Sequence, residues 1–503
     1  MANTLTLAQS SLKTLDLLSD SVQNCVNSSL ALEVADTQSF MDTPGYDNVL
    51  NKLLTAIDAE RILHQQIATK LGNAFASIKK FRNRIAKVVP AVKLPQEILV
   101  CIFETASAER GPVTNRQKYI TDTKTLFSIS HVSSYWRYIT VNTPTLWSRI
   151  DVDVIAWRGN KIPEKQRALV ERASNLPLYA NFLLGQGGFP TELIPLLNRA
   201  SFLNLAAFSC SGLANIDSLE DALTRWITNG PSNSVKNLSI DGNFPVPIMR
   251  HLSLGRLKLH AKQHLYSIQV LRLRHVSFEW SSPVYHGLVH LELSDIFQQQ
   301  RPTFQQLACI FAACPDLRVL KLASIHALDV SYERSSTPSV ALHKLELLDI
   351  VHMPHAILNL IDPGPNPLTV RISMSLTPLL PSPVIDFLKR SNTTSLYILI
   401  GALGEIGAIH EVLGASKSLH ELTLDYSNCP RMSRVARQYT RSGAQRLNLN
   451  ILRIVVGCFP VRTLCKVIER YNINTLVLKD HDRSFQPGLE RRLQDLVGHL
   501  IVY

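Results

Sequence analysis

The 503-residue chain lacks several features that assign a protein to a class at first sight. It has eight cysteines but no Cys-x-x-Cys pair, so nothing points to a zinc ribbon or a thioredoxin-type redox motif. No stretch approaches about 18 uninterrupted apolar residues, so we expect no membrane span. The N-terminus has no basic segment followed by a solid apolar run, so we expect no signal peptide. Scattered cysteines in apolar contexts are typical of reduced core residues, which predicts an intracellular protein of the cytoplasm or the nucleus.

Motifs of catalysis are also missing. No Gly-Lys-Ser/Thr follows a suitable glycine as a P-loop requires, and neither His-Glu-x-x-His nor Gly-x-Ser-x-Gly occurs. We interpret the glycine cluster Gly185–Pro190 as a turn, because no matching acidic residue or helix opening accompanies it. The pairs His260/His264 and His286/His290 have the spacing that can bind zinc on a helix, but no cysteine or carboxylate set lies nearby. We therefore expect no enzyme, no cofactor and no metal.

Acidic residues are absent from two basic stretches of a chain whose formal net charge is +12. Neither residues 61–93 nor residues 426–468 contain an Asp or a Glu, although both are rich in Lys and Arg. Solvated helix faces account for such stretches without any ligand, and a polyanion or an acidic partner is the alternative. Aromatic residues do not alternate with the arginines of residues 431–466 as an RNA-binding platform requires, so nucleic acid is not the favoured partner.

What the chain does contain begins with a long periodic segment. Hydrophobic residues make up 46% and charged residues 18%, which is typical of a folded protein. Residues 1–45, rich in Ser, Thr, Asn and Asp, predict a mobile tail, and residues 46–90 predict a long helix with a defective heptad repeat. One apolar row recurs every seventh residue, at Leu50, Ile57, His64, Leu71, Ile78 and Ile85. A second row, interrupted by arginine, comprises Leu54, Arg61, Ala68, Phe75 and Arg82. Two interpretations stay open: a helix packed within its own domain or in a hairpin, and a homodimeric coiled coil that gives weak self-association.

The segment "KLPQEILVCIFETASAE" predicts a short and very apolar helix. Pro95 suits the first helical turn, where its missing N–H is no loss, and the helix dipole favours the negative charge of Glu97 there. After a polar loop, a second helix carries apolar residues at helical spacing, namely Leu126, Ile129, Val132 and Trp136. The stretch "NTPTLWSRI" then predicts a single turn in which Thr143 caps, Pro144 takes the first position and the next apolar residues point inward. Together these segments predict a compact three-helix module.

This module resembles the F-box-like family of fungal proteins. The run Leu94-Pro95-x-Glu97-Ile98-Leu99-x-x-Ile102-Phe103 is similar to the first F-box helix. The later part matches at Val132, Trp136, Arg137, Thr143, Pro144, Leu146 and Trp147. Ser133 stands where that family often has Cys, and the polar insert departs from the compact F-box. The resemblance implies that residues 91–152 bind a Skp1-like adaptor, and through it a cullin, as the non-catalytic substrate-recognition subunit of a ubiquitin ligase that acts in ubiquitin-dependent protein degradation.

The resemblance also assigns roles to residues. The implied adaptor contacts are Leu94, Pro95, Ile98, Leu99, Ile102, Leu126, Val132 and Trp136. The implied module core is Phe103, Ile129, Leu146 and Trp147. A small helical module cannot bury so many large apolar side chains by itself, and each one withdrawn from water contributes about 1.5–3 kcal/mol. A partner protein is therefore expected, although Trp136 could instead belong to the module's own core.

Within residues 153–503, one pattern recurs after about residue 200: an apolar residue, two others, Leu, one other and an apolar residue. The copies are residues 235–240, 268–273, 288–293, 317–322, 345–350, 419–424, 449–454 and 473–478, with weaker copies near Leu368 and Leu396. The spacing resembles that of leucine-rich repeats, at about 20–29 residues each. We expect a leucine-rich-repeat-like solenoid with a parallel sheet, whose outward-facing residues select an unknown target protein. Examples of these residues are Arg272, Glu292, Lys321 and Thr423.

The predicted fold class is therefore α + α/β: a long N-terminal helix, a small F-box-like module and an irregular α/β solenoid. An ordinary α/β domain whose strands share the leucine pattern is the alternative for residues 153–503. A non-enzymatic scaffold, in which the F-box-like module only caps the repeat array, is the alternative function.

Overall fold

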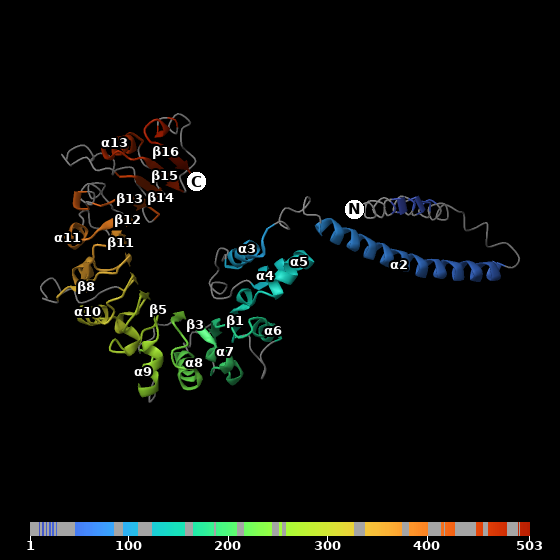
Figure 1. The fold of residues 1–503 in the computed structure, drawn as a ribbon, viewed down its shortest axis with the longest axis horizontal. Coiled ribbons are helices and arrows are strands. Elements are labelled where there is room, and N and C mark those ends of the chain that lie inside the picture. The colour runs from blue at the N-terminus through green and yellow to red at the C-terminus, as the bar shows by residue number, and fades with distance from the viewer. Residues whose placement is uncertain are drawn as a thin grey trace. The chain divides into compact units, whose positions relative to one another are not determined.

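The computed structural model describes most of the chain (Figure 1). The described residues are 46–84, 94–108, 123–155, 164–185, 188–208, 216–243, 251–253, 258–325, 338–374, 382–400, 414–416, 418–427, 449–455, 461–479 and 493–502, with Arg491 and scattered positions between 10 and 27. The predicted tail, residues 1–45, lies almost entirely outside them. The chain divides into two compact units, Met1–Leu94 and Pro95–Tyr503. No helix in this described part is long and apolar enough to cross a membrane.

The first unit contains one long helix, α2 (Tyr46–Arg84), of 39 residues. It lies where the heptad pattern predicts a helix, while Ile85 falls outside the described residues. The side chains of Leu50, Ile57 and His64 also fall outside them. Several of the remaining apolar side chains are exposed, so the described part of α2 has an uncovered apolar surface.

The second unit opens with a helical module that comprises α3 (Gln96–Ala108), α4 (Thr123–Val132), α5 (Ser134–Val141) and the 3₁₀ turn η3 (Pro144–Trp147). The single second helix predicted from the spacing is in fact two helices. Ser133 separates them, because its backbone is extended and its hydroxyl accepts a hydrogen bond from the Trp136 N–H at 3.1 Å. This is N-capping, which begins a new helix at Ser134.

A long parallel sheet follows the module, so the fold is mixed helix and strand, α + α/β. Within the described residues it has 14 strands, and neighbours in the sheet follow chain order. The strands are β1 (Arg149–Asp153), β2 (Leu178–Leu184), β3 (Ala200–Phe208), β4 (Asn237–Asn243), β5 (Val270–Arg274), β6 (His290–Ser294), β7 (Val319–Ala323), β9 (Leu347–Val351), β11 (Leu368–Met374), β12 (Thr393–Ile400), β13 (Glu421–Asp425), β14 (Ile451–Val455), β15 (Thr475–Lys479) and β16 (His499–Val502). A separate parallel pair joins β8 (Val340–Leu342) and β10 (Ile361–Pro363).

In the described residues, helical segments lie between many of the successive strands, as parallel pairing requires. They include α6 (Glu164–Arg172), α7 (Ile194–Asn198), α8 (Ile216–Asn229), α9 (Lys258–Tyr266), α10 (Phe304–Ala312), α11 (Ser382–Arg390) and α13 (Val461–Tyr471). Figure 1 shows α8, α9 and α10 along the same side of the strands. In β5, β6, β7 and β9 the second and fourth residues are buried and the others are half-buried. The core therefore lies between one face of the sheet and the helices, and the other face is accessible.

The sheet is longer than the leucine pattern predicts. Strands β1, β2 and β3 precede the first predicted copy of the pattern, and β1 lies largely within the segment predicted as the F-box-like domain. The sequences of β1 and β2, "RIDVD" and "LYANFLL", lack the repeated spacing of leucines, and three consecutive residues are buried in each. Strand β3, "ASFLNLAAF", has this spacing at Leu203 and Leu205, which pair in register with Leu238 and Ile240 of β4. Strand β16 likewise follows the last copy.

A second regularity marks the ends of four strands. The residue after each of them has a φ between 53° and 59°, although none is glycine: His275, Asp295, Ser324 and His352. Left-handed backbone is uncommon outside glycine, and Asn, Asp and His tolerate it best. Three of these residues donate their N–H to a carbonyl at the end of the next strand: His275 to Ser294, Asp295 to Ala323 and Ser324 to Val351. The repeated unit thus includes the residue directly after the strand, which the leucine pattern does not contain.

Candidate functional site

Helix α3 has two apolar rows, of which one is buried and the other is exposed. Leu99 and Phe103 are buried. Ile98 and Ile102 are 48% and 45% exposed, and Pro95, three residues earlier on the same face, is also exposed. The apolar run that predicts this helix therefore splits, with one row in the core and the other in solvent.

Helices α4 and α5 have exposed apolar side chains as well. Val132, at the end of α4, is 54% exposed, and Tyr138 and Val141 on α5 are exposed. Trp136 is half-buried, because its ring packs on Phe103 of α3 with the centroids 4.9 Å apart and the planes at 56°. Trp136 thus supports the contact between α5 and α3 and has a partly accessible edge.

The structure places the eight predicted adaptor contacts in three groups. Pro95, Ile98, Ile102 and Val132 are exposed, and Leu94 and Trp136 are half-buried. Leu99 and Leu126 are buried within the module. Adjacent residues of a helix point about 100° apart, so Leu99 turns into the module when Ile98 faces out. Of the predicted core residues, Phe103, Leu146 and Trp147 are buried and Ile129 is half-buried.

The η3 turn is anchored by Trp147, which is completely buried. Its indole Nε1–H donates to the Thr140 carbonyl at 2.6 Å, and its ring lies 5.6 Å from that of Phe127. Pro144 occupies the first position of the turn as predicted. Thr143 does not cap it through its side chain, because its hydroxyl donates back to the Ile139 carbonyl at 2.7 Å.

The helical module is packed onto the beginning of the sheet through α6. The guanidinium carbon of Arg172 lies 4.5 Å from the centre of the Trp147 ring and 5.6 Å from that of Phe127. Such stacking of Arg on aromatic faces is attractive. Helix α6 also contacts β1, so one helix holds the module and the first strand together. Sequence reasoning missed Arg172, because nothing local in its helix distinguishes it from Arg167.

The accessible face of the sheet carries a row of alternating charge, which we call the charge row: Arg272, Glu292, Lys321, Asp349 and Arg371. These residues occupy the middle position of five neighbouring strands. Glu292 Oε2 lies 3.5 Å from Arg272 Nε and 3.7 Å from Lys321 Nζ. Asp349 Oδ2 lies 3.4 Å from an Arg371 terminal nitrogen. The row therefore neutralises most of its own charge and keeps a formal charge of +1.

The pKa values of the two carboxylates in the charge row depend on the groups around them. His290, at 3.6 Å, lowers the pKa of Glu292, and Lys321 and Arg272 lower it further against the opposing effect of burial. Burial raises the pKa of Asp349, although Arg371 and Lys321 oppose this. The pKa values of these two carboxylates thus shift in opposite directions, because only Glu292 has cations on both sides within salt-bridge distance.

The charge row ends in a polar cluster on β11, β12 and β13. The Arg371 guanidinium lies 4.3 Å from the centre of the Tyr397 ring, and the Tyr397 hydroxyl donates to Asp425. Burial and this carboxylate raise the pKa of Tyr397 to about 12. Thr423, which we predicted to face out, is buried, because its neighbours in register are the larger Tyr397 and Arg453.

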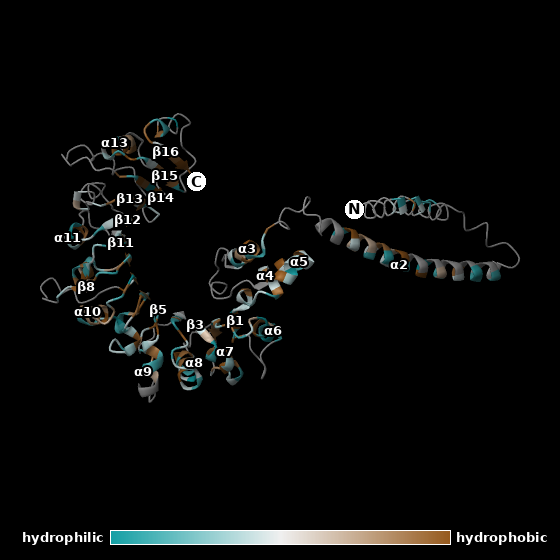
Figure 2. Ribbon diagram, in the orientation of Figure 1, coloured by the Kyte–Doolittle hydropathy of each residue, from teal (hydrophilic) through white to brown (hydrophobic). Residues whose placement is uncertain are grey.

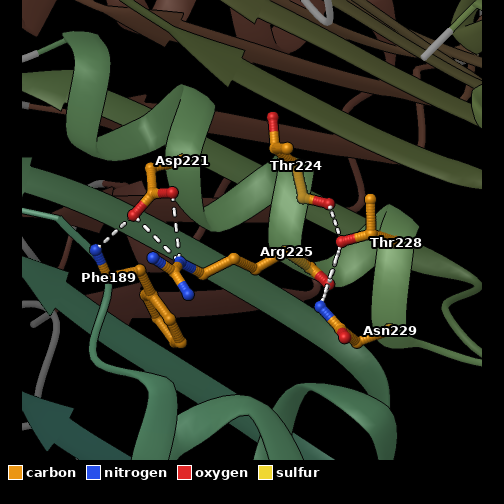
Figure 3. A network of polar contacts seen from close by, with 6 residues as sticks. All are labelled: Phe189, Asp221, Thr224, Arg225, Thr228 and Asn229. Carbon is orange, nitrogen blue, oxygen red and sulfur yellow. Dashed lines mark hydrogen bonds and ion pairs between the residues drawn. The ribbon is translucent and has the colours of Figure 1, made fainter.

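The segments considered for chemistry make the following contacts in the described residues. After β2, the Phe189 N–H donates to Asp221 Oδ2 at 2.5 Å, and both oxygens of this carboxylate accept from Arg225 Nε at 3.1 Å (Figure 3). Asp221 thus connects the loop after β2 to α8, and residues 186 and 187 of the glycine cluster lie outside the described residues. His264 bonds the Gly230 carbonyl. No group of three or more potential metal-binding side chains occurs in the described part of the chain.

Comparisons with known proteins identify the helical module. A search of curated proteins with the chain finds no significant match. The scan of protein families gives a match to the F-box-like domain over residues 91–153, which spans α3 to β1. F-box-like domains are typical of non-catalytic adaptors of ubiquitin ligases and of protein interaction, and residues 91–153 of this chain match that domain family.

Proposed function

We propose that this chain is the substrate-recognition subunit of a Skp1–cullin–F-box ubiquitin ligase. In this proposal the helical module binds a Skp1-like adaptor, and through it a cullin, while the accessible face of a leucine-rich-repeat-like sheet binds a target protein. The chain itself has no catalytic role, and it works in the cytoplasm, the nucleus or both. Catalysis belongs to other subunits, and the chain raises the effective concentration of the target beside them.

The observation that carries the proposal is the exposed apolar surface within the residues that match the F-box-like domain. Ile98, Ile102 and Val132 are each about half exposed, although each sits in a short helix whose other side is packed. Burial of such side chains contributes about 1.5–3 kcal/mol each. Several together supply the gross driving force of an interface, from which the entropy cost of association is subtracted.

The target-binding part of the proposal is supported by the accessible sheet face. Its residues differ from strand to strand, while the buried positions are nearly all aliphatic. The attachment of the module through Arg172 supports it as well, because a fixed connection would hold a target at a defined distance from the catalytic subunits.

A capture experiment with a Skp1-like adaptor tests the proposal. We expect the double variant Ile98→Asp/Ile102→Asp to lose adaptor binding by at least about a hundredfold, because two charges would enter an apolar interface. Both side chains are exposed, so the chain should stay folded. The matched control is Ile501→Asp/Val502→Asp, which places the same two charges at exposed positions on β16. Unchanged binding by the double variant would contradict the proposed interface.

A scaffold is the second candidate, and one observation favours it. The module packs on α6 and the first strand, as a cap of the sheet would. This function predicts that the unmodified chain captures no Skp1-like adaptor, so the same experiment separates the two. In either case we propose that α2 provides weak self-association.

A further inference from the structure

Helix α2 has an apolar surface that its own unit leaves uncovered in the described residues. Ile67 is 39% exposed and Ile78 is 41% exposed, and Leu54 and Phe75 are exposed as well. At about 1.5 Å per residue, 39 residues make a rod of roughly 58 Å. A helix of this length with such side chains in water is expected to bury them against a partner.

When the second row is taken one residue earlier than the row that begins at Leu54, the sequence of α2 provides a nearly continuous apolar seam for one other helix. With Leu50 as the first position of the heptad, the first positions are Leu50, Ile57, His64, Leu71 and Ile78, and the fourth positions are Leu53, Glu60, Ile67, Ala74 and Phe81. Only Glu60 and His64 are polar, and they lie near the middle of the helix. These are the positions that pack in a two-stranded coiled coil.

The charges of α2 decide the direction of a second copy. The last two turns and a half hold Lys79, Lys80, Arg82 and Arg84 without any acid, whereas the first half holds three acids, Asp47, Asp58 and Glu60, against the two bases Lys52 and Arg61. A parallel pair would set each Glu60 beside its own copy in the seam and each basic end beside the other basic end. Like charges so placed are destabilising. An antiparallel pair avoids both.

The antiparallel register also matches side chains well. First positions then face fourth positions, which pairs Leu50 with Phe81, Leu53 with Ile78 and Ile57 with Ala74. Glu60 faces Leu71 and His64 faces Ile67, so no two polar seam residues meet. At the flanks Asp47 comes beside Arg82, and Leu54 comes beside Phe75.

We infer that α2 binds α2 of a second copy of this chain as an antiparallel two-stranded coiled coil. The inference defines the surface and the direction of the self-association, and it does not depend on adaptor binding by the helical module. It also accounts for the exposure of Ile67 and Ile78, which both lie in the seam.

Sedimentation of the full chain over a range of concentrations tests the surface. We expect a monomer–dimer equilibrium, and at least about a tenfold rise in the dimer dissociation constant for Ile67→Asp/Ile78→Asp, a loss of about 1.4 kcal/mol or more. The matched control is Ile62→Asp, because Ile62 is 58% exposed on the side of α2 away from the seam. Ile67→Ala/Ile78→Ala, which keeps helix propensity, should weaken the dimer in the same direction. A monomeric wild-type chain, or a dimer that the seam variants leave intact, would overturn the inference.

A photocrosslinking amino acid in place of Phe75 tests the direction. An antiparallel dimer predicts crosslinks to the region of Leu54 in the other copy. Crosslinks to the region of Lys70, which a parallel pair brings beside Phe75, would overturn the antiparallel arrangement. Crosslinks only to other proteins would overturn self-association as the use of this surface.

Discussion

Ser133 shows how one side chain changes the local structure of the module. Its hydroxyl caps α5, so the chain turns between α4 and α5 instead of continuing as one helix. The family that the module resembles often has Cys here, and a thiol is a weaker acceptor. Serine at this position therefore accepts the capping hydrogen bond better than cysteine would.

We expect Ser133→Ala to weaken α5 by about 0.5–2 kcal/mol, because the Trp136 N–H loses its acceptor. Hydrogen exchange at the α5 amides measures this directly. Ser134→Ala is the control, since Ser134 is exposed and is the first residue of the helix itself. Equal exchange in the two variants would show that the cap contributes nothing.

His355 is a residue whose burial predicts a pH effect. Its Nε2 lies 2.9 Å from the Ser373 carbonyl, and burial lowers its pKa below the usual 6.5. The unfolded chain therefore binds a proton that the folded chain does not, so this contribution to stability is complete above about pH 6.5 and is lost as pH falls toward the folded pKa. We expect the melting temperature to fall more between about pH 7.5 and 5.5 in the wild type than in His355→Gln. An equal fall in both proteins would contradict the prediction.

At the same scale, the sequence shows which residues are apolar but not which of them face out. Ile98 and Leu99 are equivalent in the helical pattern, and only the packing of α4 and α5 on α3 distinguishes them. Arg172 was missed for a similar reason, since its aromatic partners lie in η3 and α4.

At the scale of elements, α6 connects two parts of the second unit. Arg172→Ala should raise hydrogen exchange in η3 and α6, by the equivalent of about 0.5–2 kcal/mol, because the stacking on Trp147 and Phe127 is lost. Arg167→Ala is the matched control, because Arg167 lies on the same helix and makes only exposed ion pairs. Adaptor binding should persist in both variants, since neither residue lies among the exposed apolar side chains of α3 and α4. Unchanged exchange in Arg172→Ala would show that other contacts hold the module.

The strands were predictable where leucine spacing repeats, and less so elsewhere. The predicted copies coincide with β4 to β7, β9 and β11 to β15, because alternate burial on one face demands that spacing. Strands β1 and β2 have Ile150, Val152, Ala180 and Phe182 at the corresponding buried positions, so the pattern does not reveal them. Strand β3 has leucines there and was missed although it fits the pattern. The residues after β5, β6, β7 and β9 are His, Asp, Ser and His, and their left-handed backbone could be predicted only once the ends of these strands were known.

At the scale of the whole sheet, each strand bonds only to its neighbours in the chain, apart from the β8–β10 pair. Such an array is stabilised by nearest-neighbour contacts, so a defect should stay local. We expect Leu476→Ala in β15 to cost about 2–5 kcal/mol and to raise exchange in β14 to β16, with β2 to β4 unchanged. Leu203→Ala in β3 should give the reverse distribution, since both leucines are fully buried. A uniform increase across the sheet in either variant would indicate one cooperative unit instead.

The order of the strands has a consequence for how the protein is made. Because almost every strand pairs with the one synthesised just before it, the hydrogen-bond partners of a new strand are already present when it leaves the ribosome. Contacts between residues close in sequence form quickly, since little loop entropy is lost. The sheet can therefore grow in step with translation, from the F-box-like end toward β16, without waiting for the C-terminal part of the chain.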